Sequence, residues 1–387
     1  MNFITQIKKP HWIATILTFI LVGIFTIQNY VLDTYEVNGV TVSFYNNYLI
    51  FKQSFFSLIE NLNLYTNHRP IHVDYFKYSP TFALFFGLFA PIPILLGLFI
   101  WNMLNALVFY VIWQMDLSNQ KNKFWIWAFL IVEFLTNVQS SQSNGIMAGL
   151  IILAYLFLEK KNVVLATLMV VLSVYIKLFG LVAFALFLFY PDKIKAILYA
   201  ALWGILLFLL PLIVVSPTEL IQQYENWLNL LIIDEARDYS PSVMGWLNSW
   251  FHIYPSGKLL TGLGIIMFLI PFTQIKKYSN PVFKQLILAS ILIWVVIFNH
   301  KAESPTFIIA VSGVAIWFFC QKPNPIHWVL LMLTVVFTQL SPTDLFPPHI
   351  RNEIFIPYVI KVVPVILVWF KVIYDATFLR LEDTKKA

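Results

Sequence analysis

One lysine lies within a long apolar stretch, where a charged side chain is costly and is usually functional. Lys177 interrupts the run from Val170 to Phe189, which is otherwise almost wholly hydrophobic. A cation in this setting can hold an anionic lipid phosphate or a phosphate leaving group. The alternative is a lysine at the end of a span whose charged tip reaches water. We favour the phosphate partner, because the short flanking helices place Lys177 at the outer face, with the large loops.

Two further polar segments break the apolar pattern. Between Gln139 and Asn144 the chain reads Gln-Ser-Ser-Gln-Ser-Asn, and its amides can bind sugar hydroxyls or bridge and cap helices. The residues leave both uses open. The segment after Asn299 carries His300, Lys301 and Glu303, which can bind a phosphate or move a proton. A short exposed connection is the alternative, but three ionisable groups in four residues favour a site.

A carboxylate precedes the second apolar segment, among aromatic residues. Asp74 follows His72 and is followed by Tyr75, Phe76, Lys77 and Tyr78. At an outer membrane surface Asp74 can act as general base toward an acceptor hydroxyl. The tyrosines alone also fit an ordinary interfacial belt. Other carboxylates of the same loop are Glu60, Asp33 and Glu36. A phosphate-binding glycine loop, an HExxH pair and a nucleophile elbow are all absent from the sequence.

The composition indicates the kind of molecule that positions these groups. Of 387 residues, 59% are hydrophobic and only 11% charged, whereas soluble domains carry about 25% charged residues. This excludes a cytosolic enzyme, a disordered chain and a DNA-binding domain. The net charge of +6 then orients membrane loops and does not indicate a nucleic-acid partner. The single Cys320 excludes an intrachain disulfide and a cysteine metal site, and we expect neither a metal nor a cofactor.

Apolar segments recur along the whole chain and predict an all-α polytopic membrane protein with about twelve transmembrane helices. The first follows Lys8 and Lys9 and precedes Asp33 without a small-residue cleavage site, so it is a retained span and not a signal peptide. Some of the segments are short for a core of about 30 Å. The apolar segments are 12–32, 80–92, 94–114, 125–141, 144–158, 163–176, 177–190, 196–215, 259–273, 281–298, 306–320, 326–340 and 354–374.

Loop charges predict the orientation, with one ambiguity. Lysine pairs at 8–9, 160–161 and 276–277 indicate cytoplasmic loops, so both termini are expected in the cytoplasm. Thirteen apolar segments conflict with that even parity. One broken or re-entrant helix over 125–158 would resolve the conflict, and Lys121 and Lys123 would then lie outside. We expect a single membrane domain, 1–387, with extracytoplasmic loops 33–79 and 216–258. The first of these loops should contain an interfacial helix from Tyr48 to Leu62, with Phe51, Phe55, Phe56 and Ile59 toward one side.

This layout resembles the GT-C glycosyltransferases, specifically glycosyltransferase family 87, the polyprenyl-phosphate-mannose-dependent mannosyltransferases. The first-loop stretch from Tyr45 to Tyr65 is similar to the family's pattern of an acidic residue and tyrosines. Tyr78-Ser-Pro-Thr-Phe-Ala-Leu resembles its Tyr-x-Pro-Pro-x-x-Ala-Leu start of the second span. Gln142-Ser-Asn144 matches its Gln-x-Asn, and Tyr175-Ile-Lys177, with the basic loop that follows, matches its lysine block. The similarity covers roughly residues 40–250.

The resemblance implies a reaction and a location. Such enzymes move a hexose from a polyprenyl-phosphate sugar to a lipid or glycan acceptor at the outer face of the plasma (inner) membrane, with inversion at the anomeric carbon. A first-loop carboxylate deprotonates the acceptor, and cations stabilise the departing lipid phosphate. Lys177 then becomes the phosphate partner, assisted by His300 and Lys301. Gln142 and Asn144 line the site, and Tyr78 and Glu303 also belong to the expected substrate-binding set.

One position departs from the family pattern. Where the pattern has its acidic residue, this chain has Asn47, which we place among the substrate-binding residues because an amide cannot act as a base. The base is then Asp74, or next Glu60. Two rivals stay open: a transporter or flippase of lipid-linked glycans, and a non-catalytic assembly partner. A transporter would favour inverted halves with matching broken spans, and the sequence shows no such symmetry.

Overall fold

The computed structural model describes residues 9, 11–37, 39–66, 72–117, 123–233 and 241–379. The described chain is nearly all helical, as predicted, with one small β-hairpin that the sequence reading did not anticipate. Helix α1 (Trp12–Leu32) begins at His11, whose ring nitrogen Nδ1 accepts a hydrogen bond from the Ala14 N–H at 3.4 Å. It leads into strands β1 (Thr34–Val37) and β2 (Val40–Ser43), which pair antiparallel with Thr34 opposite Ser43.

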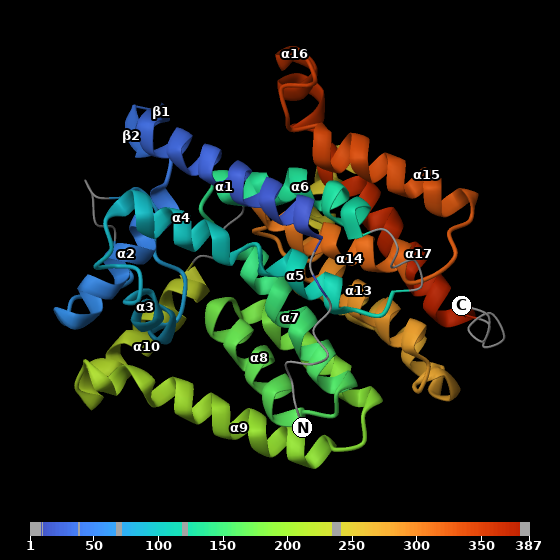
Figure 1. The fold of residues 1–387 in the computed structure, drawn as a ribbon, viewed down its shortest axis with the longest axis horizontal. Coiled ribbons are helices and arrows are strands. Elements are labelled where there is room, and N and C mark those ends of the chain that lie inside the picture. The colour runs from blue at the N-terminus through green and yellow to red at the C-terminus, as the bar shows by residue number, and fades with distance from the viewer. Residues whose placement is uncertain are drawn as a thin grey trace.

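The remaining elements of the first half follow in short steps. Proline at the start of α3 and side-chain caps from Ser79 and Asn162 define where α3 and α8 begin. The elements are α2 (Asn46–Ile59), α3 (Pro80–Phe86), α4 (Ile94–Leu104), α5 (Leu107–Gln114), α6 (Lys123–Gln139), α7 (Asn144–Glu159), α8 (Val163–Ile176), the 3-10 segment η3 (Leu178–Phe189), α9 (Lys193–Leu209) and η4 (Leu210–Ile213). In Figure 1 the β-hairpin, α2, α3 and α10 gather at the left-hand side of the molecule.

The second half contains longer buried helices and several irregular turns. Its elements are α10 (Pro217–Ile233), α11 (Val243–Phe251), α12 (Gly257–Leu269), η5 (Ile270–Thr273), η6 (Ile275–Lys277), α13 (Pro281–Ile297), η7 (Ser304–Thr306), α14 (Phe307–Phe319), α15 (Pro325–Leu333), the π-helical η8 (Thr334–Leu340), α16 (Pro348–Ile350), the π-helical η9 (Arg351–Phe355), η10 (Ile360–Val362) and α17 (Val363–Phe378). Helices α15 and α16 lie together on the upper right in Figure 1.

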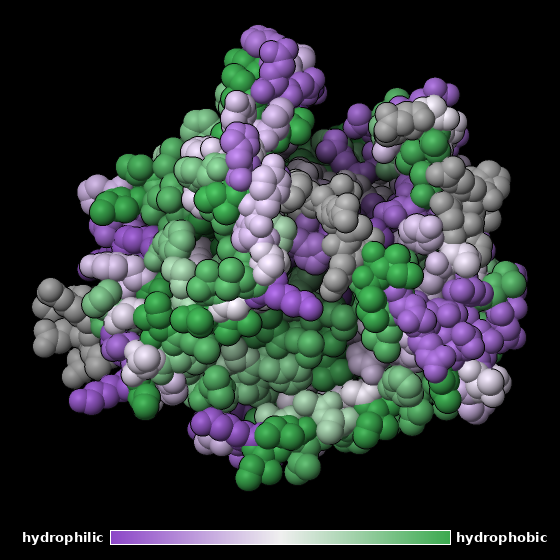
Figure 2. Space-filling view, turned by 180° about the vertical axis from the view of Figure 1, so that it is seen from behind, coloured by the Kyte–Doolittle hydropathy of each residue, from purple (hydrophilic) through white to green (hydrophobic). Residues whose placement is uncertain are grey.

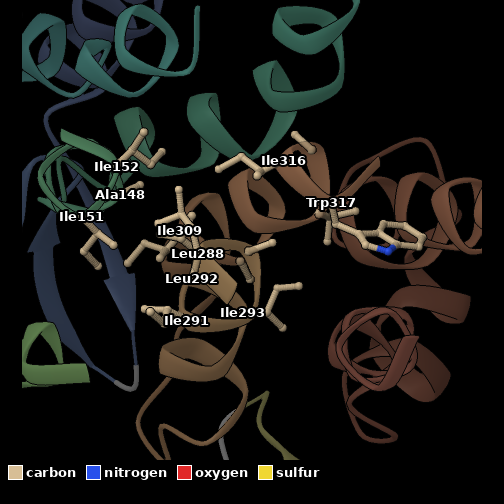
Figure 3. Close-up of a cluster of buried hydrophobic side chains, with 14 of the residues drawn as sticks. Ala148, Ile151, Ile152, Leu288, Ile291, Leu292, Ile293, Ile309, Ile316 and Trp317 are labelled. Carbon is tan, nitrogen blue, oxygen red and sulfur yellow. The ribbon is translucent and has the colours of Figure 1, made fainter. Parts of the chain in front are cut away.

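The hydrophobic core lies where α13 and α14 pack against each other and against α7 and α17. Figure 3 shows aliphatic side chains from these helices meeting, among them Ile151 of α7, Leu292 of α13 and Ile309 of α14, all fully buried. Gly313 permits the close approach of α14 to α13, because a Cβ there would lie 2.6 Å from the Ala289 carbonyl oxygen. This packing anchors the ends of both helices that reach the site described below.

The outside of the molecule is apolar over large areas. Figure 2 shows a broad hydrophobic expanse across the lower half of one face, with hydrophilic residues toward its upper and right margins. Within the described residues, three helical stretches are long and apolar enough to cross a membrane: Trp12–Leu32, Ile94–Gln114 and Lys193–Ile213. Pro348–Phe355 and Ile360–Phe378 form a fourth only if a pair bent by 78° is one span. Several shorter apolar helices accompany them, so membrane character is clear, whereas the predicted count of about twelve is not established.

The ambiguous stretch 125–158 forms two helices and not one broken span. Helix α6 ends at Gln139, α7 begins at Asn144, and Ser141 between them adopts a left-handed backbone with φ 51°. The Lys123 ammonium donates to the Lys9 carbonyl oxygen at 2.6 Å, so the start of α6 lies beside the basic N-terminal cluster. The alternative in which Lys123 lies on the opposite side is therefore wrong; Lys121 falls outside the described residues.

The predicted first-loop helix exists, with slightly different bounds and a different buried face. Helix α2 spans Asn46–Ile59, and its buried residues include Tyr48, Phe51 and Leu58. Ile59, expected on the same side as Phe51, is instead exposed. The face is set by packing against α3 and α4, where the Phe51 ring meets those of Phe82 and Trp101.

Candidate functional site

A cavity of about 410 Å³ lies where the first-loop helix, the α8–η3 junction and the segment after α13 converge. It brings together residues that are up to 256 positions apart, from Asn47 to Glu303. Eight of the ten predicted site residues line it: Asn47, Asp74, Tyr78, Gln142, Lys177, His300, Lys301 and Glu303. The sequence-predicted segments therefore meet at one place, although nothing in the geometry alone assigns their roles.

Lys177 occupies the break between α8 and η3. Its extended backbone (φ −144°, ψ 127°) ends α8, and Gly180 lets η3 fold back, since a Cβ there would lie 2.3 Å from Ser173 Oγ. The ammonium donates to the side-chain oxygen of Asn144 at 2.7 Å and to that of Gln142 at 3.4 Å. Neutral amide oxygens orient the cation without cancelling its charge, so it remains able to attract an anion.

Gln142 connects several of the polar groups. Its Oε1 accepts from Lys177 and, at 3.3 Å, from the Tyr78 hydroxyl, while its Nε2 donates to Glu303 Oε2 at 3.1 Å. Its backbone is fixed in turn by Asn137, whose side-chain amide donates to the Gln142 carbonyl at 3.4 Å. The glutamine thus links a cation, a phenol and a carboxylate from three distant parts of the chain.

Asn144 supports the cavity from behind its wall. The residue is fully buried and does not line the cavity, but its Oδ1 holds Lys177, and its Nδ2 donates to the Pro305 carbonyl at 3.1 Å. Asn144 also begins α7, whose backbone N–H at this residue donates to Asn137 Oδ1 at 3.2 Å. The asparagine therefore ties Lys177 to the segment that carries Glu303.

Tyr78 forms the aromatic wall beside the cation. Its ring stacks on Phe82 with 4.6 Å between centroids, and Lys177 Nζ lies 5.7 Å from the Tyr78 centroid. Burial raises the pKa of the Tyr78 hydroxyl well above its ordinary value, and Glu303 and Asp74 raise it further. The phenol therefore stays protonated and donates to Gln142 over the whole physiological pH range.

The first-loop residues divide into those inside the cavity and one outside it. Asn47 lines the cavity and donates from its amide to the Ser140 carbonyl at 2.8 Å. Asp74 also lines it; its Oδ1 accepts from the Tyr75 N–H at 2.7 Å and lies 3.4 Å from Lys77 Nζ. Glu60 follows the opposite end of α2, about 20 Å from Asn47 at 1.5 Å per residue, and is exposed outside the cavity lining.

Several lining residues carried no signal in the sequence. Trp227 of α10 donates from its indole to the Lys77 carbonyl at 3.1 Å, and Phe179 follows Lys177 directly. Trp294 and Phe298 come from the last turn of α13. In a chain that is 17% aromatic, no local pattern distinguishes an aromatic residue of a site from one of the core.

The comparison with protein families decides the class. The model of glycosyltransferase family 87 matches residues 76–342, more than half of the chain. The chain belongs to glycosyltransferase family 87. A search of curated proteins finds no match.

Family 87 membership, together with the apolar helices, identifies a membrane glycosyltransferase that uses a sugar donor and a glycan or lipid acceptor. The match reaches further toward the C-terminus than the 40–250 range expected from motifs, and includes Gln142, Lys177 and Glu303. It begins after Asp74, so the first-loop resemblance around Asn47 lies outside the matched range.

Proposed function

We propose that this family 87 enzyme transfers a hexose from a polyprenyl-phosphate sugar to a lipid or glycan acceptor on the extracytoplasmic face of the plasma membrane. Mannose is the first sugar to test. The observation that carries the proposal is the Lys177 ammonium, held by the neutral oxygens of Asn144 and Gln142 on a cavity that also contains carboxylates.

In this mechanism Lys177 binds the phosphate of the donor. The acceptor oxygen attacks the anomeric carbon, its proton passes to Asp74, and the bond from the anomeric carbon to the phosphate oxygen breaks. The bonding electrons leave with the polyprenyl phosphate, whose charge Lys177 stabilises with the help of His300 and Lys301. Attack opposite the leaving group inverts the anomeric carbon. No cofactor takes part in the proposed reaction.

The side chains around the cation suit a hexose. Gln142 and Asn47 offer amides to sugar hydroxyls, and Tyr78 offers a ring face beside Lys177. Glu303 can accept from a further hydroxyl. Glu60 has no part in the proposal, because it lies outside the cavity lining.

The test is sugar transfer in proteoliposomes, with radiolabelled polyprenyl-phosphate mannose or glucose as donor and a membrane lipid extract as acceptor. We expect a labelled product with wild type, and a loss of at least about 100-fold in Asp74→Asn, the size typical of a missing general base. Lys177→Ala should lose a comparable amount. Glu60→Gln, a matched carboxylate change outside the cavity, should retain activity.

The outcomes separate the parts of the proposal. Full activity in Asp74→Asn would remove Asp74 as the base while the enzyme stands. No product with either donor, from protein that is folded and reconstituted, would contradict the proposed donor class and favour the transporter or the non-catalytic assembly partner.

A further inference from the structure

A second and larger cavity adjoins the candidate site. It measures about 730 Å³ and lies between α11, the first half of α12 and the end of α13. Phe298 and His300 line both cavities, so these two residues form a shared wall. Lys177, Gln142 and Asp74 line the smaller cavity alone. A molecule in the larger cavity therefore reaches the candidate site past Phe298 and His300.

The lining of the larger cavity is polar at one end and apolar along the rest. Ser256 and Lys258 lie at the start of α12, whereas Ile265 lies seven residues further, about 10 Å along the helix axis. Met244, Leu260 and Ile297 supply apolar surface in between. Such a gradient matches an amphipathic molecule with its headgroup near Lys258 and its chain beside the helix.

The helix that bounds the cavity is accessible from the apolar surroundings. Along α12, Leu259 and Ile266 are 60% and 64% exposed, and this helix belongs to an apolar segment of the membrane-embedded part. A lipid can therefore enter from the side. Among the described residues that line the cavity, Lys258 is charged and none is a carboxylate, which favours an anionic headgroup.

We infer that the larger cavity binds the sugar acceptor, and that this acceptor is an anionic membrane phospholipid with a hydroxyl-bearing headgroup. The inference rests on the proposed function and deepens it. A donor phosphate on Lys177 and an acceptor arriving past His300 come from separate cavities. That separation is what a displacement with inversion requires of its nucleophile and leaving group.

A glycine offers a direct test. Gly262 lines the cavity, and a Cβ added there meets no atom within 4 Å, so a large side chain can fill the space without a backbone clash. Gly204 of α9 has equally open surroundings and lines neither cavity. Gly262→Phe and Gly204→Phe thus make the same change on two apolar helices, one inside the proposed site and one outside it.

The measurement is photolabelling of the full-length protein in liposomes with phosphatidylglycerol that carries a diazirine in its acyl chain, with no sugar donor present. We expect adducts on α12 in wild type and in Gly204→Phe. Labelling should fall about tenfold in Gly262→Phe, equal to roughly 1.4 kcal/mol of binding. Lys258→Ala, at an exposed position, should also lower it, and serves if Gly262→Phe does not fold.

Three results would overturn the inference. They are labelling of α12 that Gly262→Phe leaves unchanged, equal labelling by a zwitterionic phosphatidylcholine probe, and stronger labelling by a photoreactive polyprenyl phosphate. Because labelling needs no donor, it is independent of catalysis. Normal labelling without any transfer would contradict the proposed function, whereas transfer that Gly262→Phe leaves unchanged would contradict only the acceptor site.

Discussion

At the scale of single residues, the candidate site depends on how Lys177 is held. A buried carboxylate as its direct partner would neutralise the ammonium and oppose an incoming phosphate. Here the direct partners are amide oxygens, and Glu303 is reached only through Gln142. The amide can therefore orient the cation while the charge stays available to a ligand.

Removing that amide should weaken the use of the donor. Gln142→Leu keeps the approximate size of the side chain but deletes its bonds to Lys177, Tyr78 and Glu303. We expect transfer to fall by about tenfold or more, since lost hydrogen bonds to charged groups are worth roughly 1.5–3 kcal/mol. The measurement is the initial transfer rate as a function of donor concentration.

The control for this change is Gln139→Leu, which deletes an exposed amide three residues earlier. It should leave the rate within about twofold of wild type, as expected for surface changes. If Gln142→Leu were equally silent, the amide would have no part in positioning the cation.

Sequence could predict the polar residues of the site but not their relative placement. Lys177 was recognisable because it interrupts an apolar run, and the same signal applied to Glu133 would have found a second buried charge. Glu133 is fully buried and pairs with Lys361 at 2.6 Å. Glu60 was not distinguishable from Asp74 by type, because only the length of α2 separates it from the cavity.

At the scale of elements, the turn between α6 and α7 positions the amides. Gly145 lies directly after Asn144 and packs against the junction of α4 and α5, where a Cβ would lie 2.5 Å from the Asn105 carbonyl oxygen. Backbone cannot yield as a flexible side chain can. A methyl group here must push α7 away and carry Asn144 with it.

Gly145→Ala should therefore destabilise the protein by about 1–3 kcal/mol, the usual cost of overpacking, despite the better helix propensity of alanine. Thermal unfolding in detergent measures this. Gly204→Ala, where a Cβ meets nothing within 4 Å, should not lower the midpoint. An unchanged midpoint for Gly145→Ala would show that α7 and the α4–α5 junction are not held tightly.

The helices themselves were largely predictable, because their apolar runs are bounded by polar or proline residues. The hairpin β1–β2 was not, since four-residue strands lie below the length at which alternation is informative. The α6–α7 joint needed the structure as well. Its direction is fixed by the contact of Lys123 with Lys9, which joins residues 114 positions apart.

At the scale of the whole molecule, orientation determines whether the cavity can meet a substrate on the outer face. The loop charges predict that the segment at the end of α2 lies outside and that the Lys276–Lys277 segment lies in the cytoplasm. The structure separates these regions, since the Lys277 ammonium bonds to the Thr377 carbonyl near the end of α17, whereas α2 packs on α3.

Cysteine labelling can test this orientation, because the sequence has one cysteine and it is buried. In a Cys320→Ala background, Leu62→Cys and Ile275→Cys place thiols at residues that are 45% and 71% exposed. A membrane-impermeant maleimide added to intact cells should label the first and spare the second, and both should react after the membrane is opened. The reverse pattern would place Lys177 and its cavity on the cytoplasmic side. The donor would then have to present its phosphate in the cytoplasm, so this result would contradict the extracytoplasmic reaction while leaving family membership intact.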